Sequence, residues 1–385
     1  MDISDTKIGI ESTIIPPFET NLKAANMYEK LGFDSLWFGD HIMSLWPDAI
    51  WTPDIVNMAS YMKNPHDMYN AFPTMAVVAN NTKKVFLGTS VTESFRHPPS
   101  LLAHMILTID HISKGRVILG IGAGEGENIV PYGIKWEKPI GRLEEAIKII
   151  KLLWKHDKKV NFEGNFWKLK DAVLSLKPYK KNKPPPIWIG AFKPKMLELT
   201  GKIGDGWLPY NLNPKRYKER LEIIQRSAKN EGRNPDEITS GIEVSVIIDE
   251  KIEECDKMIE HPLVKNHLLF SDNETFKEYG LSHPFGDNFY GILDYIPTRY
   301  DKKTLIDAFE KIPIEMCKDF YLVGTPDDII GKLEEYAKIG VKHIVIHNLT
   351  SACDIRKVQS STLCIKKVLD HIKEDELKMI EPIPG

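Results

Sequence analysis

Short apolar runs alternate with longer helical patterns along almost the whole chain. Eight of these short runs are rich in β-branched and aromatic residues and have no regular polar face. Continuous apolar runs of this length are typical of strands that are buried on both faces of a parallel sheet. They cover residues 7–11, 35–39, 85–92, 116–123, 187–191, 206–210, 242–248 and 343–348.

The segments between these runs carry the three- and four-residue apolar spacing of amphipathic helices. The clearest example is 139–156, which begins with a proline, a residue that suits the first helical position. A second helix is predicted over 325–339. Thr325 can cap its N-terminus, and Gly340 follows its last residue.

Eight strand–helix units in 385 residues predict an α/β fold, a (β/α)8 TIM barrel, with a doubly wound open sheet as the alternative. We expect a single domain over 1–385, because no repeat or linker interrupts the pattern. Two segments, 42–71 after the second strand and 255–311 after the seventh, are too long to be simple connections. Insertions after barrel strands lie at the C-terminal face, where active sites form.

Composition excludes several classes of protein. The chain is 42% hydrophobic and 27% charged, with a net charge of −3, which argues against disorder and against a general attraction to nucleic acid. Its four cysteines form no C-x-x-C pair, and no apolar run approaches the ~20 residues that span a bilayer. We therefore expect a cytoplasmic protein that acts on a small molecule.

The glycine-rich segment 120–126 resembles a dinucleotide-binding fingerprint but does not match it. Glu125 or Glu127 stands where the third glycine would be required. Small residues at the end of a strand still allow a backbone to approach a ligand closely, and the Glu125 carboxylate could accept hydrogen bonds from it. A tight turn with a solvated glutamate is the alternative.

Asp40 and His41 directly follow the second predicted strand, which would put a carboxylate and an imidazole at the rim of a barrel. Histidine is the usual general acid or base near neutral pH. Neighbouring residues of a strand point to opposite sides, so Asp40 need not orient His41. A loop histidine bound to backbone is the alternative.

No metal site is predicted. His97, His104 and His111 recur every seven residues, but the spacing lacks a third ligand on one face, and H-E-x-x-H is absent. His343 and His347 share one face of the last predicted strand, and His347 lies near its C-terminal end, where a site residue could be.

Several motifs, in order, resemble the bacterial luciferase-like superfamily. They are FGDH (38–41), LGTSVTESFRHPP (87–99), GRVILGIGAGEGEN (115–128), GRLEEAIKIIKLLW (141–154), PIWIGA (186–191) and GDGW (204–207). Within it the chain is most similar to the coenzyme F420-dependent branch, and there to the phthiodiolone dimycocerosate ketoreductases, because of 283–304 and GTPDDII (324–330).

This resemblance implies a flavin or deazaflavin at the C-terminal mouth of the barrel. It implies His41 as proton donor beside the redox ring, with Glu125 as the second catalytic residue. The third strand would hold the back of the ring, with a non-proline cis peptide at Ser90–Val91. The remaining cofactor-binding positions it implies are Asp40, Thr92, Gly122, Ala123, Gly124, Asn128, Gly190, Ala191, Phe192 and Lys193.

Two departures from the family pattern narrow the range of expected substrates. Phe192-Lys193 replaces a glycine pair of the family's sugar-phosphate dehydrogenases, and 317–320 lacks their phosphate-binding arginine. Glucose 6-phosphate is therefore not expected. Trp46 stands near the position of an aromatic wall of the pocket.

The resulting hypothesis is hydride transfer between reduced coenzyme F420 and a carbonyl or alcohol substrate, by a protein that is a homodimer as many relatives are. Three alternatives stay open: an FMN-dependent monooxygenase on the same barrel, a methylenetetrahydromethanopterin reductase, and a barrel without catalysis that serves as a binding protein.

Overall fold

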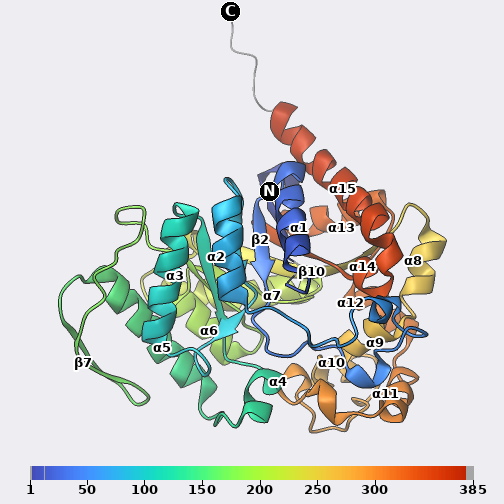
Figure 1. Cartoon of the computed structure of the whole chain (residues 1–385), viewed down its shortest axis with the longest axis horizontal. Coiled ribbons are helices and arrows are strands. Elements are labelled where there is room, and N and C mark those ends of the chain that lie inside the picture. Colours follow the sequence, from blue (N-terminus) through green and yellow to red (C-terminus); the bar gives the residue numbers. More distant parts are fainter. Residues whose placement is uncertain (1, 13, 379–385) are drawn as a thin grey trace, which may run out of the picture.

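The eight predicted strands close into a parallel barrel in the computed structural model, which describes residues 2–12 and 14–378 (Figure 1). The strand order is β12–β1–β2–β3–β5–β8–β9–β10, and pairing of β10 with β12 closes the ring. The barrel strands are β1 (Lys7–Glu11), β2 (Ser35–Phe38), β3 (Phe86–Thr89) continued by β4 (Thr92–Glu93), β5 (Val117–Gly122), β8 (Ile187–Ile189), β9 (Gly206–Trp207), β10 (Thr239–Ile248) and β12 (His343–Asn348). The predicted barrel is confirmed, and the open sheet is excluded.

Helices surround the barrel and also build a cap at one side of it. They are α1 (Phe18–Leu31), α2 (Ala71–Asn81), α3 (Pro99–Ser113), α4 (Gly126–Ile129), α5 (Pro139–Lys155), α6 (Pro194–Ile203), α7 (Pro214–Asn230), α8 (Ile252–Met258), α9 (Pro262–Leu268), α10 (Asn273–Lys277), α11 (Lys302–Phe309), α12 (Ile314–Phe320), α13 (Pro326–Lys338), α14 (Leu349–Cys353) and α15 (Val358–Lys378). Both helices predicted from periodicity are present, as α5 and α13. Thr325 caps α13 in a capping box with Asp328.

The two faces of each barrel strand pack differently. Outward side chains such as Ile8 and Ile10 join the main hydrophobic core under the helices. Inward side chains from five strands form a separate apolar plug: Trp37, Ile118, Trp188, Leu208 and Val345. This two-sided burial explains why the strands read as continuous apolar runs.

His343 lies at the opposite end of β12 from its neighbour His347. Its Nε2 is 2.7 Å from Oγ of Ser35, which also accepts a hydrogen bond from Nε1 of Trp37. The two histidines do share the inward face, but His343 belongs to the buried floor of the barrel.

The third predicted strand is divided. β3 ends at Thr89 and β4 begins at Thr92, and the peptide bond between Ser90 and Val91 is cis, as the family resemblance implied. Val91 projects inward and packs against the apolar plug.

Sequence periodicity missed two further features. The antiparallel pair β6 (Val160–Glu163) and β7 (Lys168–Ala172) forms an arm outside the barrel, where the Glu145 carboxylate accepts hydrogen bonds from the backbone N–H groups of Asn165 and Phe166. β11 (Leu322–Gly324) extends the sheet beside the end of β10. β6 and β7 are polar and largely exposed, and β11 is only three residues long, so none of them resembles a strand buried on two faces.

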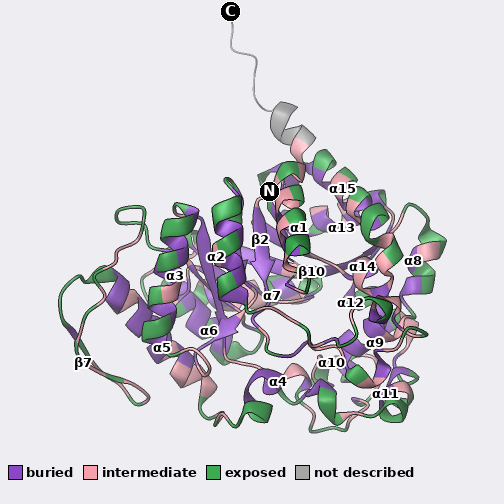
Figure 2. Ribbon diagram, in the orientation of Figure 1, coloured by how far each residue is buried: buried purple, intermediate pink, exposed green. Residues whose placement is uncertain are grey.

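The segments 42–71 and 255–311 lie together and share a second hydrophobic cluster (Figures 1 and 2). Ile50 and Trp51 of the first segment pack there with Leu263 and Phe276 of the second. The first segment contains short 3-10 turns, whereas the second contains α8 to α11.

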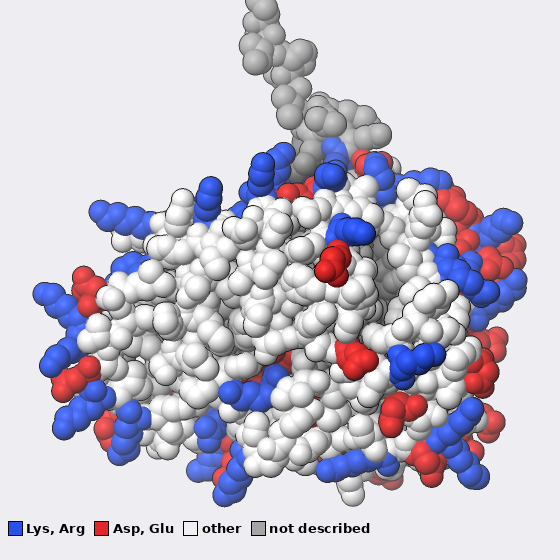
Figure 3. Space-filling view, viewed as in Figure 1, with Lys and Arg blue, Asp and Glu red and all other residues white. Residues whose placement is uncertain are grey.

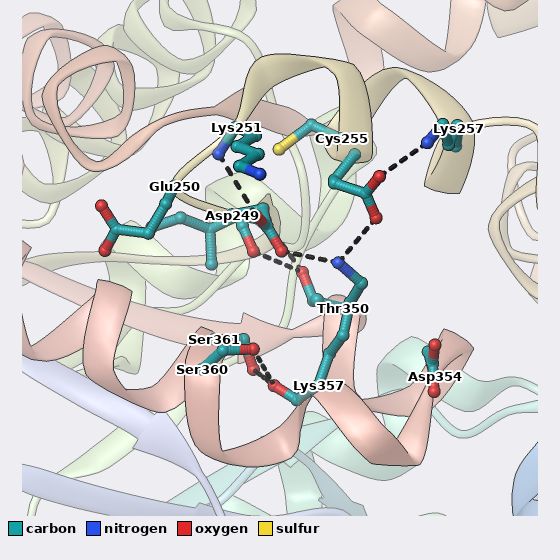
Figure 4. Close-up of polar contacts among 12 residues, drawn as sticks. Asp249, Glu250, Lys251, Cys255, Lys257, Thr350, Asp354, Lys357, Ser360 and Ser361 are labelled. Carbon is teal, nitrogen blue, oxygen red and sulfur yellow. Dashed lines mark hydrogen bonds and ion pairs between the residues drawn. The ribbon is translucent and has the colours of Figure 1, made fainter.

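The end of β10 is tied to the C-terminal helices by a compact polar network (Figure 4). Nζ of Lys357 lies 2.8 Å from Asp249 and 2.9 Å from Glu254, and Thr350 donates and accepts hydrogen bonds at the Ile248 backbone. These contacts fix the point at which the chain leaves the barrel for α8. Among the described helices, none combines the length and apolar character needed to cross a bilayer.

Candidate active site

The C-terminal mouth of the barrel has a glycine half and a polar half. Alternation along β2, β5 and β8 brings Gly39, Gly122 and Gly190 inward above the apolar plug. The same alternation brings Glu11, Glu243 and Ser245, and His347 inward from β1, β10 and β12. One half therefore leaves room for a ligand, and the other presents groups that can hydrogen-bond to it.

Val91 forms the floor of the glycine half. A Cβ atom on Gly122 would lie 2.9 Å from Cγ2 of Val91, and one on Gly190 would lie 3.2 Å from the same atom. Ser90 beside it has a buried hydroxyl oxygen with no hydrogen-bond partner among the described residues. An orphaned hydroxyl next to an apolar floor is what a flat polar ring lying there would satisfy.

His41 is held by Glu127. Nδ1 of His41 lies 2.9 Å from Oε1 of Glu127, which is fully buried, and 3.7 Å from Oε2 of Glu125. Asn128 lies 3.1 Å from the same ring nitrogen and accepts a hydrogen bond from the Ile42 backbone. The fold thus brings together the predicted residues His41, Glu125 and Asn128, and it adds Glu127.

These neighbours set the charge of the site. Burial favours neutral His41, but the hydrogen bond to Glu127 and the charges of Glu125 and Glu127 outweigh it and raise the pKa of His41 to about 9. Burial raises the pKa of Glu125 to about 8, and the adjacent Glu127 carboxylate adds to this rise. These shifts favour protonated His41 and protonated Glu125 at neutral pH.

Asp40 is a buried scaffold residue. Its Oδ2 accepts hydrogen bonds from Thr92 Oγ1 at 2.6 Å and Arg96 Nη2 at 3.0 Å, and lies 3.1 Å from His97 Nε2. Burial opposes its ionisation, but His97 and Arg96 outweigh this and keep the pKa of Asp40 below its usual range. Asp40 does not contact His41 through its side chain, and only 1% of its surface is exposed.

The polar half contains a second cluster, formed by Glu11, Glu243 and His347. Ligand atoms of all three lie within 4.8 Å of one another. His347 Nε2 is 3.3 Å from Glu11, its Nδ1 is 3.1 Å from Ser245 Oγ, and Ser245 Oγ is 2.7 Å from the Tyr210 hydroxyl. Of these residues only His347 was a sequence candidate. Polar residues at inward positions near strand ends were the signal for the others.

The loop after β8 carries the last group of predicted residues. Ala191 accepts a hydrogen bond from Trp207 Nε1 at 2.9 Å, and Phe192 is exposed. Lys193 forms an ion pair with Asp272, the residue that caps α10. The loop is thus joined to the second long segment.

Gly124 has a left-handed backbone, and Ala123 accepts a hydrogen bond from Trp136. The Trp46 ring lies 4.4 Å from that of His267 on α9, at the roof of the polar half. The first long segment therefore meets the second above the mouth.

Among the residues that the structure describes, two sets could hold a metal on distance alone: Glu11, Glu243 and His347, and His41, Glu125 and Glu127. In the second set, the hydrogen bond to Glu127 already occupies Nδ1 of His41. In both sets, protons shared between the side chains can neutralise the negative charge of the carboxyl groups without a cation.

Comparison with known proteins assigns the family. The profile of the luciferase-like monooxygenases matches residues 4–343. The chain belongs to this luciferase-like family. The resemblance found in the motifs is thereby confirmed.

Two relatives within the family are oxidoreductases. The chain is 32% identical to the phthiodiolone/phenolphthiodiolone dimycocerosates ketoreductase of Mycobacterium tuberculosis over 93% of its own length and 94% of the relative's. It is 29% identical to the 5,10-methylenetetrahydromethanopterin reductase of Archaeoglobus fulgidus, over 82% and 86% of the two chains.

The barrel itself is similar to those of solved family structures. An F420-dependent secondary alcohol dehydrogenase in complex with an F420-acetone adduct aligns with TM-score 0.74 at 22% identity, covering 95% of this chain and 99% of that one. A type II Baeyer-Villiger monooxygenase from Pseudomonas putida in complex with FMN aligns with TM-score 0.65 at 18% identity, covering all of both chains. At these identities the likeness concerns the fold.

Proposed function

We propose that the protein is a coenzyme F420-dependent oxidoreductase that transfers a hydride between the reduced deazaflavin and a carbonyl or alcohol substrate. The observation that carries the proposal is the His41–Glu127 pair beside a glycine-lined floor at the barrel mouth. The ketoreductase and F420-dependent names among the relatives support a deazaflavin and a carbonyl substrate.

The residues of the glycine half fit such a cofactor. Val91 offers an apolar surface for a flat ring, and the unsatisfied Ser90 hydroxyl offers a hydrogen bond to its polar edge. Backbone at Gly122 and Gly190 carries no side chain that would obstruct it. Lys193 would reach the anionic tail beyond the loop, in exchange for its ion pair with Asp272.

In ketone reduction, a bound reduced deazaflavin supplies the hydride. His41 donates the proton that converts the developing alkoxide into an alcohol, because Glu127 keeps its ring protonated at neutral pH. Nε2 of His41 has no hydrogen-bond partner among the described residues, which leaves it for the substrate oxygen. The proton that Nε2 gives up is replaced from solvent, and Glu125, 3.7 Å from Nδ1, is the second group of the site that is protonated near neutral pH.

The direct test is a parallel titration of the cofactor-free protein with coenzyme F420 and with FMN, followed by fluorescence. We expect selective binding of F420, and then oxidation of reduced F420 that depends on an added ketone such as 2-butanone. Selective binding of FMN with oxygen consumption would contradict the proposal and favour a monooxygenase. Binding of neither would favour a barrel without redox chemistry.

A further inference from the structure

Glu243 is a carboxyl group in the mouth that the mechanism above does not use. It points inward from the middle of β10, between Tyr210 and the strand β12. Its carboxyl oxygen lies within 4.8 Å of ligand atoms of Glu11 and His347. Within the described part of the chain its side chain forms no hydrogen bond and no ion pair with Lys or Arg.

His267 is a second unsatisfied group, on the roof of the same half. It comes from α9 in the second long segment, and it is only 5% exposed, yet its Nδ1 has no hydrogen-bond partner among the residues described. Its ring lies 5.5 Å from that of His347 and 6.3 Å from that of Tyr210. His347 is thus a neighbour of both Glu243 and His267.

Buried polar groups in folded proteins are nearly always hydrogen-bonded, and an exception calls for an explanation. Here the buried Nδ1 of His267 is such an exception, and the half-buried Glu243 carboxyl group, which also has no hydrogen-bond partner among the described residues, is a second neighbour of His347. A ligand that enters the mouth can satisfy both at once.

We propose that Glu243 and His267 form a substrate subsite that binds an uncharged oxygen group, a hydroxyl or a carbonyl, which is separate from the carbonyl that is reduced. The inference rests on the proposed function and extends it to the class of substrate: a ketone or alcohol that carries a second oxygen.

The charge of the subsite favours an uncharged group. Burial, together with the charges of Glu11 and Glu125, raises the pKa of Glu243 well above its usual range, against the opposing charge of His41. Burial and His347 lower the pKa of His267. Burial also raises the pKa of Tyr210.

These shifts favour the uncharged forms of Glu243, His267 and Tyr210. A phosphate or carboxylate of the substrate would meet the acidic residues Glu11 and Glu243, and no Lys or Arg of the described part of the chain forms an ion pair with either. A hydroxyl can accept from the Glu243 carboxyl group and donate to the imidazole of His267.

Infrared spectroscopy of the purified protein tests the binding without any turnover. At pH 7 we expect a protonated-carboxyl band that disappears in Glu243→Gln and remains in Glu222→Gln, a control on the exposed side of α7. Glu125→Gln identifies the separate band of Glu125. Adding 1,3-butanediol should shift the Glu243 band, whereas 2-butanol, which lacks the second hydroxyl, should not.

Kinetics with reduced F420 test the specificity. Glu243→Met should raise the KM for 4-hydroxy-2-butanone by about 10- to 100-fold and leave that for 2-butanone within about threefold, because one hydrogen bond to a buried group is lost. Glu243→Gln, which retains an N–H donor, should raise the KM for 4-hydroxy-2-butanone less than Glu243→Met does. His267→Phe, which retains the ring beside Trp46, should have the same selective effect as Glu243→Met.

Three results would overturn the subsite: no Glu243 band at pH 7, a band that 1,3-butanediol does not move, or equal effects of the variants on both ketones. Tighter binding of 4-amino-2-butanol than of the diol would also overturn it, since that points to a cation site. Failure of the proposed function is a different result, because it appears in wild type as absence of F420 binding or of turnover with either ketone.

Discussion

His41 and Glu127 depend on each other at the residue scale. A fully buried carboxylate is costly unless it is paired, and the His41 ring provides the partner at 2.9 Å. In return, Glu127 keeps that ring protonated and fixes which nitrogen faces the ligand. In the proposed mechanism the acid is thus a pair of residues, one that follows β2 and one on α4.

Replacing His41 tests the proton donor. His41→Ala should lower turnover of the carbonyl substrate by about 100-fold, because the developing alkoxide loses its acid. The affinity for F420, measured by titration, should stay within about threefold, since proton donation is not part of cofactor binding. Unchanged turnover would remove His41 from the mechanism.

The pH dependence of turnover tests Glu127. Ketone reduction needs protonated His41, whose pKa is raised to about 9, so the wild-type rate should be level near neutral pH and fall as pH rises through about 9. Glu127→Gln removes the charge and the hydrogen-bond acceptor that raise this pKa. The turnover of this variant should therefore begin to fall at a pH about one unit or more below that at which wild-type turnover falls.

Glu125→Gln is the matched comparison, because Glu125 titrates in the same region with a pKa of about 8. This substitution should shift the pH at which turnover falls by less than Glu127→Gln does, since Glu125 is farther from His41 than Glu127 is. An identical pH profile in wild type and Glu127→Gln would show that Glu127 does not control the acid.

The sequence predicted His41 and Glu125 as site residues but not Glu127 or Glu243. The first two stand in recognisable motifs at predicted strand ends. Glu127 was visible only as a departure from a glycine motif, and its partner is 86 positions away. Glu243 looked like one polar residue in an apolar run, because contacts across a barrel depend on strand register, which periodicity does not give.

At the element scale, the second long segment is fastened directly to the active-site elements. The 3-10 turn Gly291–Leu293 packs on α4, so close that a Cβ atom on Gly126 would overlap the Leu293 carbonyl oxygen. Ion pairs of Asp272 with Lys193 and of Glu278 with Arg216 hold both ends of α10 to the rim of the barrel. The roof of the site and the loop that carries Glu125 and Glu127 are therefore one packed unit.

Adding one methyl group tests this packing. Gly126→Ala should separate the turn from α4, because the backbone atoms there cannot move aside locally. Turnover should fall by about 10-fold or more, and residues 255–311 should become more sensitive to limited proteolysis. Gly331→Ala on α13 is the control: no atom lies within 4 Å of its added Cβ, so activity and cleavage should not change. Equal behaviour of the two variants would contradict a tight contact.

The elements that could be predicted are those whose stability comes from two-sided burial. All eight barrel strands have this pattern, whereas β6, β7 and β11 are short or partly exposed and do not. The helices of 255–311 could be located only as a long segment, because α8 to α11 are short and share a cluster with distant residues such as Ile50.

At the scale of the whole molecule, one part of the surface lacks charge. Figure 3 shows an uncharged area over α2 and α3, whereas Lys, Arg, Asp and Glu surround it. The exposed residues of these two helices are Pro73, Val77, Asn80, Asn81, Ser100, Leu101, His104, Thr108, His111 and Ile112. Charged residues usually cover the exposed side of a barrel helix, so their absence on two adjacent helices favours an interface.

We expect a second copy of the chain to cover this face in the predicted homodimer, because an uncharged surface can meet itself without like-charge repulsion. Analytical ultracentrifugation should find two copies of the 44.0 kDa chain in the wild-type particle and one in Leu101→Glu, which would place two charges in the contact. Leu363→Glu on α15 is the matched control, since Leu363 is 53% exposed and Leu101 47% exposed, and it should remain dimeric. A monomeric wild type, or a dimer that Leu101→Glu leaves intact, would contradict this interface. A folded Leu101→Glu monomer that still binds F420 would further show that each barrel mouth is complete within one chain.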